Sequence, residues 1–228
     1  MSSKVVKLSQ ETLQILKLAS TINKSLAFKA GSEIKTVSAT GSIVMDAAIP
    51  ETFPVDFAVY ELPKLLGVLA LPAFKEAELV FEDGVDTHML IKAGSSKIKY
   101  YYTPEDFAKH PGKAIVLPKV DVEVNLQRDV LENFEKAAAA LGHKFLKFKV
   151  DNKKLYMIAT TPEVDTSNDY IVDLGDNEAE DFEAMIKLEN LKLVPGDFNL
   201  QLVKLGGKGI SKWSHLTRKI NIFIGLEL

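Results

Sequence analysis

The chain repeats itself at an offset of about 120 residues, and this duplication limits the folds that it can adopt. Leu8 is matched by Leu126, 118 residues later, and Phe28 is matched by Phe148, 120 residues later. Two longer segments recur in the same order. They are LPKLL at 62–66 with LENLKL at 188–193, and KIKYYYT at 97–103 with KINIFIG at 219–225. Ordered matches at nearly constant offset predict two copies of one fold.

Each copy is predicted to be rich in strands and to carry two short helices. Apolar residues recur at helical spacing over 10–23 and 127–141, and the leucines of 62–71 do the same after Pro63, a residue suited to a first helical turn. The echo of 62–66 at 188–193 places the fourth helix there. Alternation of apolar and polar residues predicts strands around these helices, so the fold class is α+β with antiparallel sheets. The strands are expected at 26–30, within 32–48, and at 55–59, 77–81, 87–93, 97–103, 120–126 and 146–150.

A proline-rich segment separates the two copies. Periodicity is lost over 103–116, where Pro104, Pro111 and Gly112 gather ahead of Pro118. We therefore expect an N-terminal domain at 1–108, an interdomain connector at 109–119 and a C-terminal domain at 120–228. Full exposure of the apolar residues at 115–117 to water would be unfavourable. The connector therefore either packs against the rest of the protein or provides a binding surface for a partner. Both interpretations stay open.

Composition argues against several classes of protein. The chain has no cysteine, which excludes disulfides and thiolate chemistry, and no apolar run that predicts a signal peptide or a membrane span, so we expect a soluble protein. Its 28 bases and 31 acids give a net charge of −3, which argues against a protein that coats nucleic acid with its whole surface.

Catalytic chemistry finds no support in the motifs. The four histidines are scattered without ligand spacing, so neither a metal nor another cofactor is expected. The glycine-rich stretch at 206–209 lacks the spacing of a phosphate-binding loop and fits a hairpin turn better. Six acids without a base at 173–183 fit a solvated loop. The sequence therefore predicts a protein that is not an enzyme.

One face of the first helix has a character of its own. Its polar stripe contains no acid and consists of Gln10, Gln14, Lys17, Thr21 and Lys24. Such a face can lie against a phosphate backbone without like-charge repulsion and can donate hydrogen bonds to phosphate oxygens while reading no bases. Taken alone, the same stripe would also suit a solvated helix surface.

Several segments resemble a known family. VKLSQETLQILKLASTIN at 6–23, VDFAVYELPKLLGVLAL at 55–71, LVPGDFNLQL at 193–202 and the duplication are similar to the sliding clamps, or DNA polymerase processivity factors, of T-even-type bacteriophages. The resemblance implies a ring of three identical chains around duplex DNA, with twelve helices, two per domain, inside and the sheets outside. It also implies that the clamp tethers the replicative DNA polymerase, is placed on DNA by an ATP-dependent clamp loader, and works in the cytoplasm of the infected bacterial host. Members of the family also touch the transcription machinery, which this sequence does not test.

The resemblance implies that six basic residues contact DNA. They are Lys17, Lys24, Lys64, Arg128, Lys136 and Lys192. Two acids, Glu132 and Glu135, interrupt the third helix, so the second domain has no dense basic stripe. The resemblance also implies an apolar pocket for a partner's terminal peptide, which we expect at Tyr102, Ile115, Val116, Leu117, Pro118 and Phe223. For Phe223, as for Leu226, the alternative is a place in the core of a sheet.

Two rival functions remain to be weighed. A processivity factor that forms no ring would hold DNA by charge, and it should carry a much more basic face than this chain has. A two-domain enzyme with an unrecognised site would need a deep polar cleft. The missing catalytic constellation counts against the enzyme.

Overall fold

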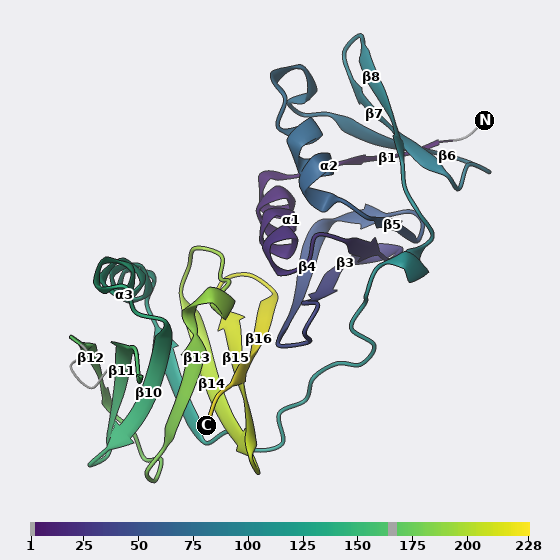
Figure 1. Ribbon diagram of the computed structural model, residues 1–228. Coiled ribbons are helices and arrows are strands. Elements are labelled where there is room, and N and C mark those ends of the chain that lie inside the picture. Colours follow the sequence, from purple (N-terminus) through teal and green to yellow (C-terminus); the bar gives the residue numbers. More distant parts are fainter. Residues whose placement is uncertain (1–2, 164–167) are drawn as a thin grey trace. The chain divides into compact units, whose positions relative to one another are not determined.

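The computed structural model describes residues 3–163 and 168–228 (Figure 1). It divides into two compact units, Met1–Lys113 and Ala114–Leu228. The division falls within the proline-rich segment, in which 108–121 form neither a helix nor a strand.

The first unit is built from eight strands, two α-helices and two short 3₁₀ helices. Strands β1, β6, β7 and β8 form one antiparallel sheet in that order. Strand β2 pairs with β5, and β3 pairs with β4. The elements are β1 (Ser3–Lys7), α1 (Gln10–Ile22), β2 (Leu26–Phe28), β3 (Gly31–Val37), β4 (Ile43–Phe53), β5 (Phe57–Val59), α2 (Leu62–Leu69), η1 (Pro72–Phe74), β6 (Glu78–Glu82), β7 (His88–Ala93), β8 (Ser96–Tyr101) and η2 (Glu105–Phe107).

The second unit has the same order of elements. One antiparallel sheet runs β12, β11, β10, β13, and the strands β16, β15, β14 and β9 pair in that order in another. The elements are β9 (Val122–Leu126), α3 (Arg128–Leu141), β10 (Phe145–Asp151), β11 (Lys154–Thr160), β12 (Tyr170–Asp176), β13 (Glu183–Lys187), η3 (Leu188–Asn190), β14 (Phe198–Leu205), β15 (Lys208–His215) and β16 (Ile220–Leu226).

The pairing of strands confirms the duplication. In both units the strand before the first helix pairs with the strand that opens the final three-stranded meander, β1 with β6 and β9 with β14. The strand after that helix pairs with the strand before the second helical segment, β2 with β5 and β10 with β13. The prediction of two copies of an α+β fold with antiparallel sheets is therefore confirmed.

The expectation of two α-helices per domain is wrong for the second unit. Among its described residues α3 is the single α-helix, and the echo of α2 is the three-residue 3₁₀ helix η3. The segment after η3 is too short for a stable helix, since Pro195 restricts Val194 to extended backbone. In α2, by contrast, Pro63 supports the first turn. Figure 1 shows α1 and α2 side by side, whereas α3 lies alone over β11 and β12.

Buried aromatic side chains fill the core of each unit. In the first, the rings of Phe28 and Phe57 stack at a centroid distance of 4.6 Å, and Phe53 meets Phe28 edge to face at 4.9 Å. In the second, the ring centroid of Trp213 lies 6.3 Å from that of Phe148 and 6.3 Å from that of Phe198. Burial of side chains of this size contributes about 1.5–3 kcal/mol each, so these clusters hold the sheets and helices in register.

Candidate nucleic-acid interface and partner pockets

Helix α1 begins at a well-anchored turn. Ser9 is its N-cap residue, and the Ser9 hydroxyl accepts a hydrogen bond from the Thr12 backbone N–H at 3.1 Å. The carboxylate of Glu51, from β4, accepts hydrogen bonds from the Ser9 backbone N–H and from the Thr12 hydroxyl. Burial alone would raise the pKa of Glu51, but the hydrogen bonds from Thr12 and Ser9 outweigh it, so the pKa lies below its usual value. A negative charge at this helix end is also favoured by the helix dipole.

The polar stripe of α1 faces solvent. Ile15, Leu16 and Ala19 are buried on the opposite side, while Lys17 and Lys24 are exposed. The Lys24 carbonyl accepts the Leu62 backbone N–H at 2.7 Å, which joins the end of the first helix to the start of α2. Lys64, on α2, is exposed and lies 2.5 Å from the carboxylate of Glu61. The first unit therefore exposes three of the predicted basic residues, Lys17 on α1, Lys24 just after the end of α1, and Lys64 on α2.

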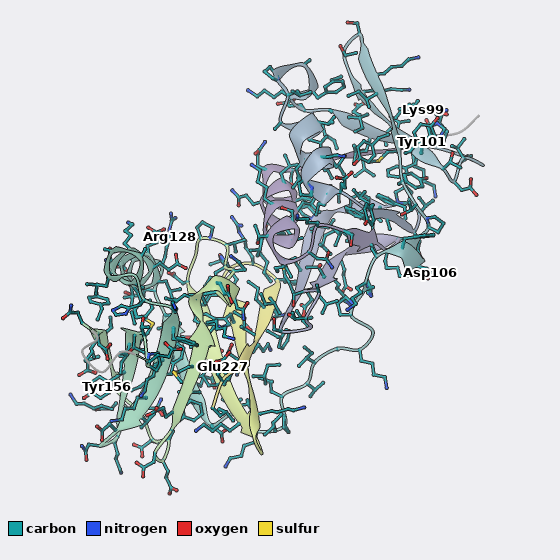
Figure 2. All side chains as sticks on the ribbon, in the orientation of Figure 1. Lys99, Tyr101, Asp106, Arg128, Tyr156 and Glu227 are labelled. Atoms are coloured by element: carbon teal, nitrogen blue, oxygen red, sulfur yellow. The ribbon has the colours of Figure 1, made fainter. Side chains whose placement is uncertain are left out.

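Helix α3 mixes charges of both signs. Arg128, labelled in Figure 2, donates from Nε to Glu132 Oε1 at 2.6 Å. Lys136 is exposed and Lys192 is half-buried. Burial, and then the neighbouring Glu132, raises the pKa of Glu135, while Lys192 opposes this shift, which places Lys192 near the helix. The sequence prediction of a sparse basic face in the second domain agrees with this arrangement.

A residue far along the chain fixes the start of α3. Gln127 makes no side-chain cap, and the Asp197 carboxylate accepts the Arg128 backbone N–H at 2.7 Å instead. Asp197 follows Gly196, whose φ is +155° and where an added Cβ would lie 2.1 Å from His215 Nε2. Sequence reasoning missed the roles of Asp197 and Glu51, because neither residue is near its helix in the chain. For Asp197, the one sequence signal was its place in the segment LVPGDF, which is part of the family resemblance.

The residues predicted for a partner pocket lie in different settings. Tyr102 is half-buried and lines a hollow in the first unit together with Lys4 and residues 54–56 and 81–86. Ile115 and Leu117 are half-buried, Pro118 is exposed, and Val116 is 83% exposed. Phe223 is buried in β16, with Lys212 Nζ 6.0 Å from its ring centroid, and Leu226 is buried in the same strand. The pocket as a whole stays a prediction.

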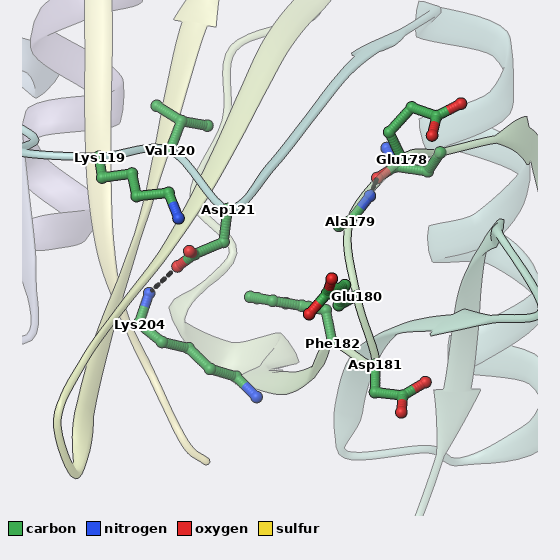
Figure 3. A pocket seen from close by; sticks show the side chains of 10 residues that line it. Lys119, Val120, Asp121, Glu178, Ala179, Glu180, Asp181, Phe182 and Lys204 are labelled. Atoms are coloured by element: carbon green, nitrogen blue, oxygen red, sulfur yellow. Dashed lines mark hydrogen bonds between the residues drawn. The ribbon is translucent and has the colours of Figure 1, made fainter.

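A larger hollow of about 760 Å³ lies beside the end of the connector (Figure 3). Its walls are residues 119–121 and the acidic loop 177–182. Lys204 donates its backbone N–H to Asp121 at 2.7 Å. The Lys204 Nζ lies 4.6 Å from the centroid of the Phe182 ring, so the lysine side chain covers the aromatic residue of the hollow. The hollow combines charges of both signs without a nucleophile and base in contact.

Neither a metal site nor a membrane helix emerges from the described structure. Residues 3–163 and 168–228 contain no group of three histidine, aspartate or glutamate side chains placed to hold a metal ion. No helix in these same ranges is long and apolar enough to cross a membrane.

Solved structures share this two-domain architecture. The chain superposes on the PCNA2–PCNA3 complex from Sulfolobus tokodaii with a TM-score of 0.67 at 15% identity, covering 99% of both chains. Proliferating cellular nuclear antigen from Entamoeba histolytica gives a TM-score of 0.69 at 12% identity, over 99% of this chain and 98% of that one. The PCNA of the structure "C-terminal region of FEN-1 bound to A. fulgidus PCNA" gives a TM-score of 0.69 at 9% identity, over 100% of this chain and 98% of that one. The fold is therefore that of a DNA sliding clamp.

Sequence comparison defines the family within this class. The chain matches the family "DNA polymerase processivity factor" over residues 7–117 and the family "gp45 sliding clamp, C terminal" over residues 123–228. The sliding clamp of Vibrio phage KVP40 is 26% identical over 228 residues, covering 97% of this chain and 99% of the relative. The sliding clamp of Enterobacteria phage T4 is 26% identical over 212 residues, covering 91% and 92%. The chain belongs to the phage sliding-clamp family of DNA polymerase processivity factors.

This membership confirms the function predicted from the sequence, a clamp that tethers a DNA polymerase to DNA. The family acts in phage DNA replication as a processivity factor rather than as a catalyst.

Proposed function

We propose that three copies of this chain close head to tail into a ring around duplex DNA in the cytoplasm of an infected bacterium. An ATP-dependent clamp loader supplied by other proteins opens and closes the ring, because a closed ring cannot thread itself onto a long template. The observation that supports the proposal best is a pair of sheet edges, one in each unit, that have opposite charge and pair with no further strand among residues 3–163 and 168–228.

The edge in the first unit is basic. Strand β8 ends its sheet, and Lys97, Lys99 and Tyr101 are exposed at alternate positions along it. Figure 2 labels Lys99 and Tyr101. Burial, and then the charge of Glu61, raises the pKa of Tyr100 on the same strand. The apolar side chain of Tyr60, just before α2, is 70% exposed, and that of Leu71, just after it, is 47% exposed.

The edge in the second unit is acidic. Strand β12 ends its sheet and carries Asp173 and Asp176, with Ile171 58% exposed between Asp169 and Asp173. Helix α3 packs over this strand, has no basic residue in its last turn, and ends in the exposed side chains of Ala139, Ala140 and Leu141.

Pairing of these two edges between neighbouring chains would satisfy both strands. An open edge is a liability for a soluble protein, and β8 of one copy against β12 of the next would bring lysines to aspartates and apolar helix ends together. Because the contact joins different surfaces, it generates a closed ring or an open filament, and only a ring leaves no copy of β8 or β12 without its partner strand.

Charge reversal tests the ring directly. We expect sedimentation equilibrium across a range of concentrations to show three chains, and Lys97→Glu with Lys99→Glu to shift the mass toward one chain. Adding Asp169→Lys and Asp176→Lys to the same chain should restore the trimer, since both edges then have reversed charge. A strict monomer before any substitution would overturn the ring and favour a factor held to DNA by charge. Disruption without restoration would overturn the pairing of these edges.

DNA contact through the ring is expected to be weak and to involve Lys17, Lys24 and Lys64 more than Arg128, Lys136 and Lys192. Topological linkage keeps the protein on DNA, so non-specific phosphate contacts are sufficient and allow sliding. The chain's net charge of −3 is compatible with this role because only the surface that faces DNA must be basic.

The polymerase peptide is expected to dock at the exposed part of the connector, where Val116 and Pro118 project from a backbone without regular structure. Exposed apolar side chains on such a segment can enclose an anchor residue when a partner arrives. Serine at Val116 should weaken polymerase binding without changing the mass of the assembly.

A further inference from the structure

The first unit contains the hollow that Tyr102 lines, and none of the connector residues 109–119 lines it. It has a volume of about 300 Å³ and lies where the β4–β5 turn, the β6–β7 turn and the residue after β8 meet the start of β1. This volume is at the lower end of the range for ligand sites, about 300–1,000 Å³, and suits one or two side chains better than a metabolite.

The floor of the hollow is apolar and rigid. Phe81 is 4% exposed, and its ring lies 5.5 Å from that of Phe57. The ring of Phe57 lies 5.0 Å from that of Tyr102, so the floor continues the aromatic core of the unit. Val55, which is 39% exposed, and the half-buried Val85 add aliphatic walls. A floor built in this way needs no rearrangement to receive an apolar side chain.

The rim of the hollow is acidic. Glu82, Asp83, Asp86 and Asp56 line it together with a single base, Lys4. Lys29 Nζ lies 3.2 Å from Asp56 Oδ2, and the Ala30 backbone N–H donates to Asp56 Oδ1 at 2.6 Å, so this acid is held in place. Asp83 and Asp86 are exposed on the β6–β7 turn. The rim therefore attracts cations and repels DNA.

The turn that carries these acids is held by its own backbone. The Val85 N–H donates to the Glu82 carbonyl at 3.1 Å, and Gly84 has a φ of +79°, a conformation that favours glycine. The Tyr102 N–H donates to the Thr87 carbonyl at 3.1 Å, and the Tyr102 hydroxyl approaches the Val85 carbonyl at 3.5 Å. Floor and rim are thus fixed relative to each other.

We propose that this hollow is a docking site for a segment of a partner protein that carries a bulky apolar side chain between lysines or arginines. The apolar side chain fills the space over Phe81 and beside Val55, and the flanking bases meet Asp83 and Asp86. The site lies wholly within the first unit and is separate from the connector residues, so it gives the clamp a second point of attachment. Its occupation does not depend on the ring.

Peptide binding to the full chain tests the proposal. The probe is a fluorescein-labelled peptide, Lys-Arg-Leu-Phe-Arg-Lys, and the reference has alanine in place of Leu-Phe. We expect fluorescence anisotropy to show at least tenfold tighter binding of the first peptide. The variant Val55→Ser with Val85→Ser should remove most of this preference. Asp83→Asn with Asp86→Asn should weaken the first peptide about tenfold and reduce its dependence on salt. The matched control, Glu78→Gln at the far end of β6, should have no effect.

Several outcomes would overturn the assignment. Equal binding of the two peptides, or no measurable binding at millimolar concentration, would show that the floor accepts no anchor. Loss of binding in Val116→Ser with retention in both sets of hollow variants would move the site to the connector. If the valine variant does not fold, the aspartate variant decides, because its two positions are exposed on a turn.

Discussion

Arg128 and Glu132 lie one turn apart on α3 and form an ion pair, with 2.6 Å between Nε and Oε1. Both side chains reach solvent, so the pair adds little to the stability of the helix. Its larger effect is on binding, because a guanidinium that already faces a carboxylate is less available to a phosphate. The pair therefore reduces the DNA contact expected of Arg128, as the Glu61 carboxylate does for Lys64 in the first domain.

Glutamine at position 132 should release Arg128 for DNA. We expect Glu132→Gln to tighten binding to a short duplex and to steepen the dependence of log affinity on log salt by about 0.9, the value for one added phosphate contact. Anisotropy of a labelled duplex, measured over a range of salt concentrations, gives this slope. Glu180→Gln, in the β12–β13 loop, removes the same charge and should leave the slope unchanged. An identical slope in the two variants would show that Arg128 does not reach phosphate.

Alanine at Lys17, Lys24 and Lys64 together should reduce clamp-dependent processive synthesis several-fold while leaving the mass of the assembly unchanged. The reason is that these exposed lysines, on α1, just after it and on α2, supply charge to phosphates but lie outside the paired strands β8 and β12. Product length in an assay with polymerase and loader measures the effect. Alanine at Lys75, Lys153 and Lys208 is the matched control, because Lys75 and Lys153 are exposed in turns and Lys208 is exposed at the start of β15. Unchanged synthesis in the first variant would contradict the assignment of the DNA face.

Glutamine at Glu51 should destabilise the first unit by about 1–3 kcal/mol at neutral pH, because the charged acceptor for Ser9 and Thr12 is lost. The folded-state pKa of Glu51 lies below its usual value, so its contribution is present above that usual value and is lost as pH falls through the folded-state pKa. Denaturant unfolding followed at neutral pH and again below pH 4.5, the usual value, should show the two proteins converging in acid. A constant difference at both pH values would place the effect in packing rather than charge.

Alanine at Gly196 should destabilise the second unit by at least about 2 kcal/mol, because its Cβ would overlap the His215 ring and its backbone conformation favours glycine. His215 also contacts Phe198 edge to face at 5.1 Å, so displacement of its ring would disturb the core. Thermal unfolding measures the change. Gly207→Ala is the control, since an added Cβ there meets nothing within 4 Å. Equal stability of the two variants would show that His215 moves aside freely.

The repeats in the sequence were sufficient to predict the duplicated architecture. Periodicity placed the first helix at 10–23 and the third at 127–141, and the structure has them at Gln10–Ile22 and Arg128–Leu141, with Gly142 in the left-handed conformation at the end of α3. These boundaries were readable because the signals for helix start and end are local. The fourth helix was not, because the echo LENLKL matches α2 in its leucines but lacks an initial proline and soon meets Pro195.

The surfaces were harder to predict than the fold. The exposed positions of Lys17, Lys24 and Lys64 follow from helical spacing. The cap that Asp197 provides for α3 joins residues 69 positions apart, and the hollow beneath Asp83 joins four separate segments. Such contacts depend on how strands are brought together in space, which no local pattern encodes.

The turn that replaces a helix at Leu188–Asn190 bears on how the clamp would move along its template. In a ring of three such chains, two-helix and one-helix segments would alternate, so the surface that meets DNA would repeat three times per revolution rather than six. A duplex that rotates as it passes would then find three preferred orientations separated by shallow barriers. Rotation of the duplex within this clamp would favour certain angles, but it would have no preferred direction.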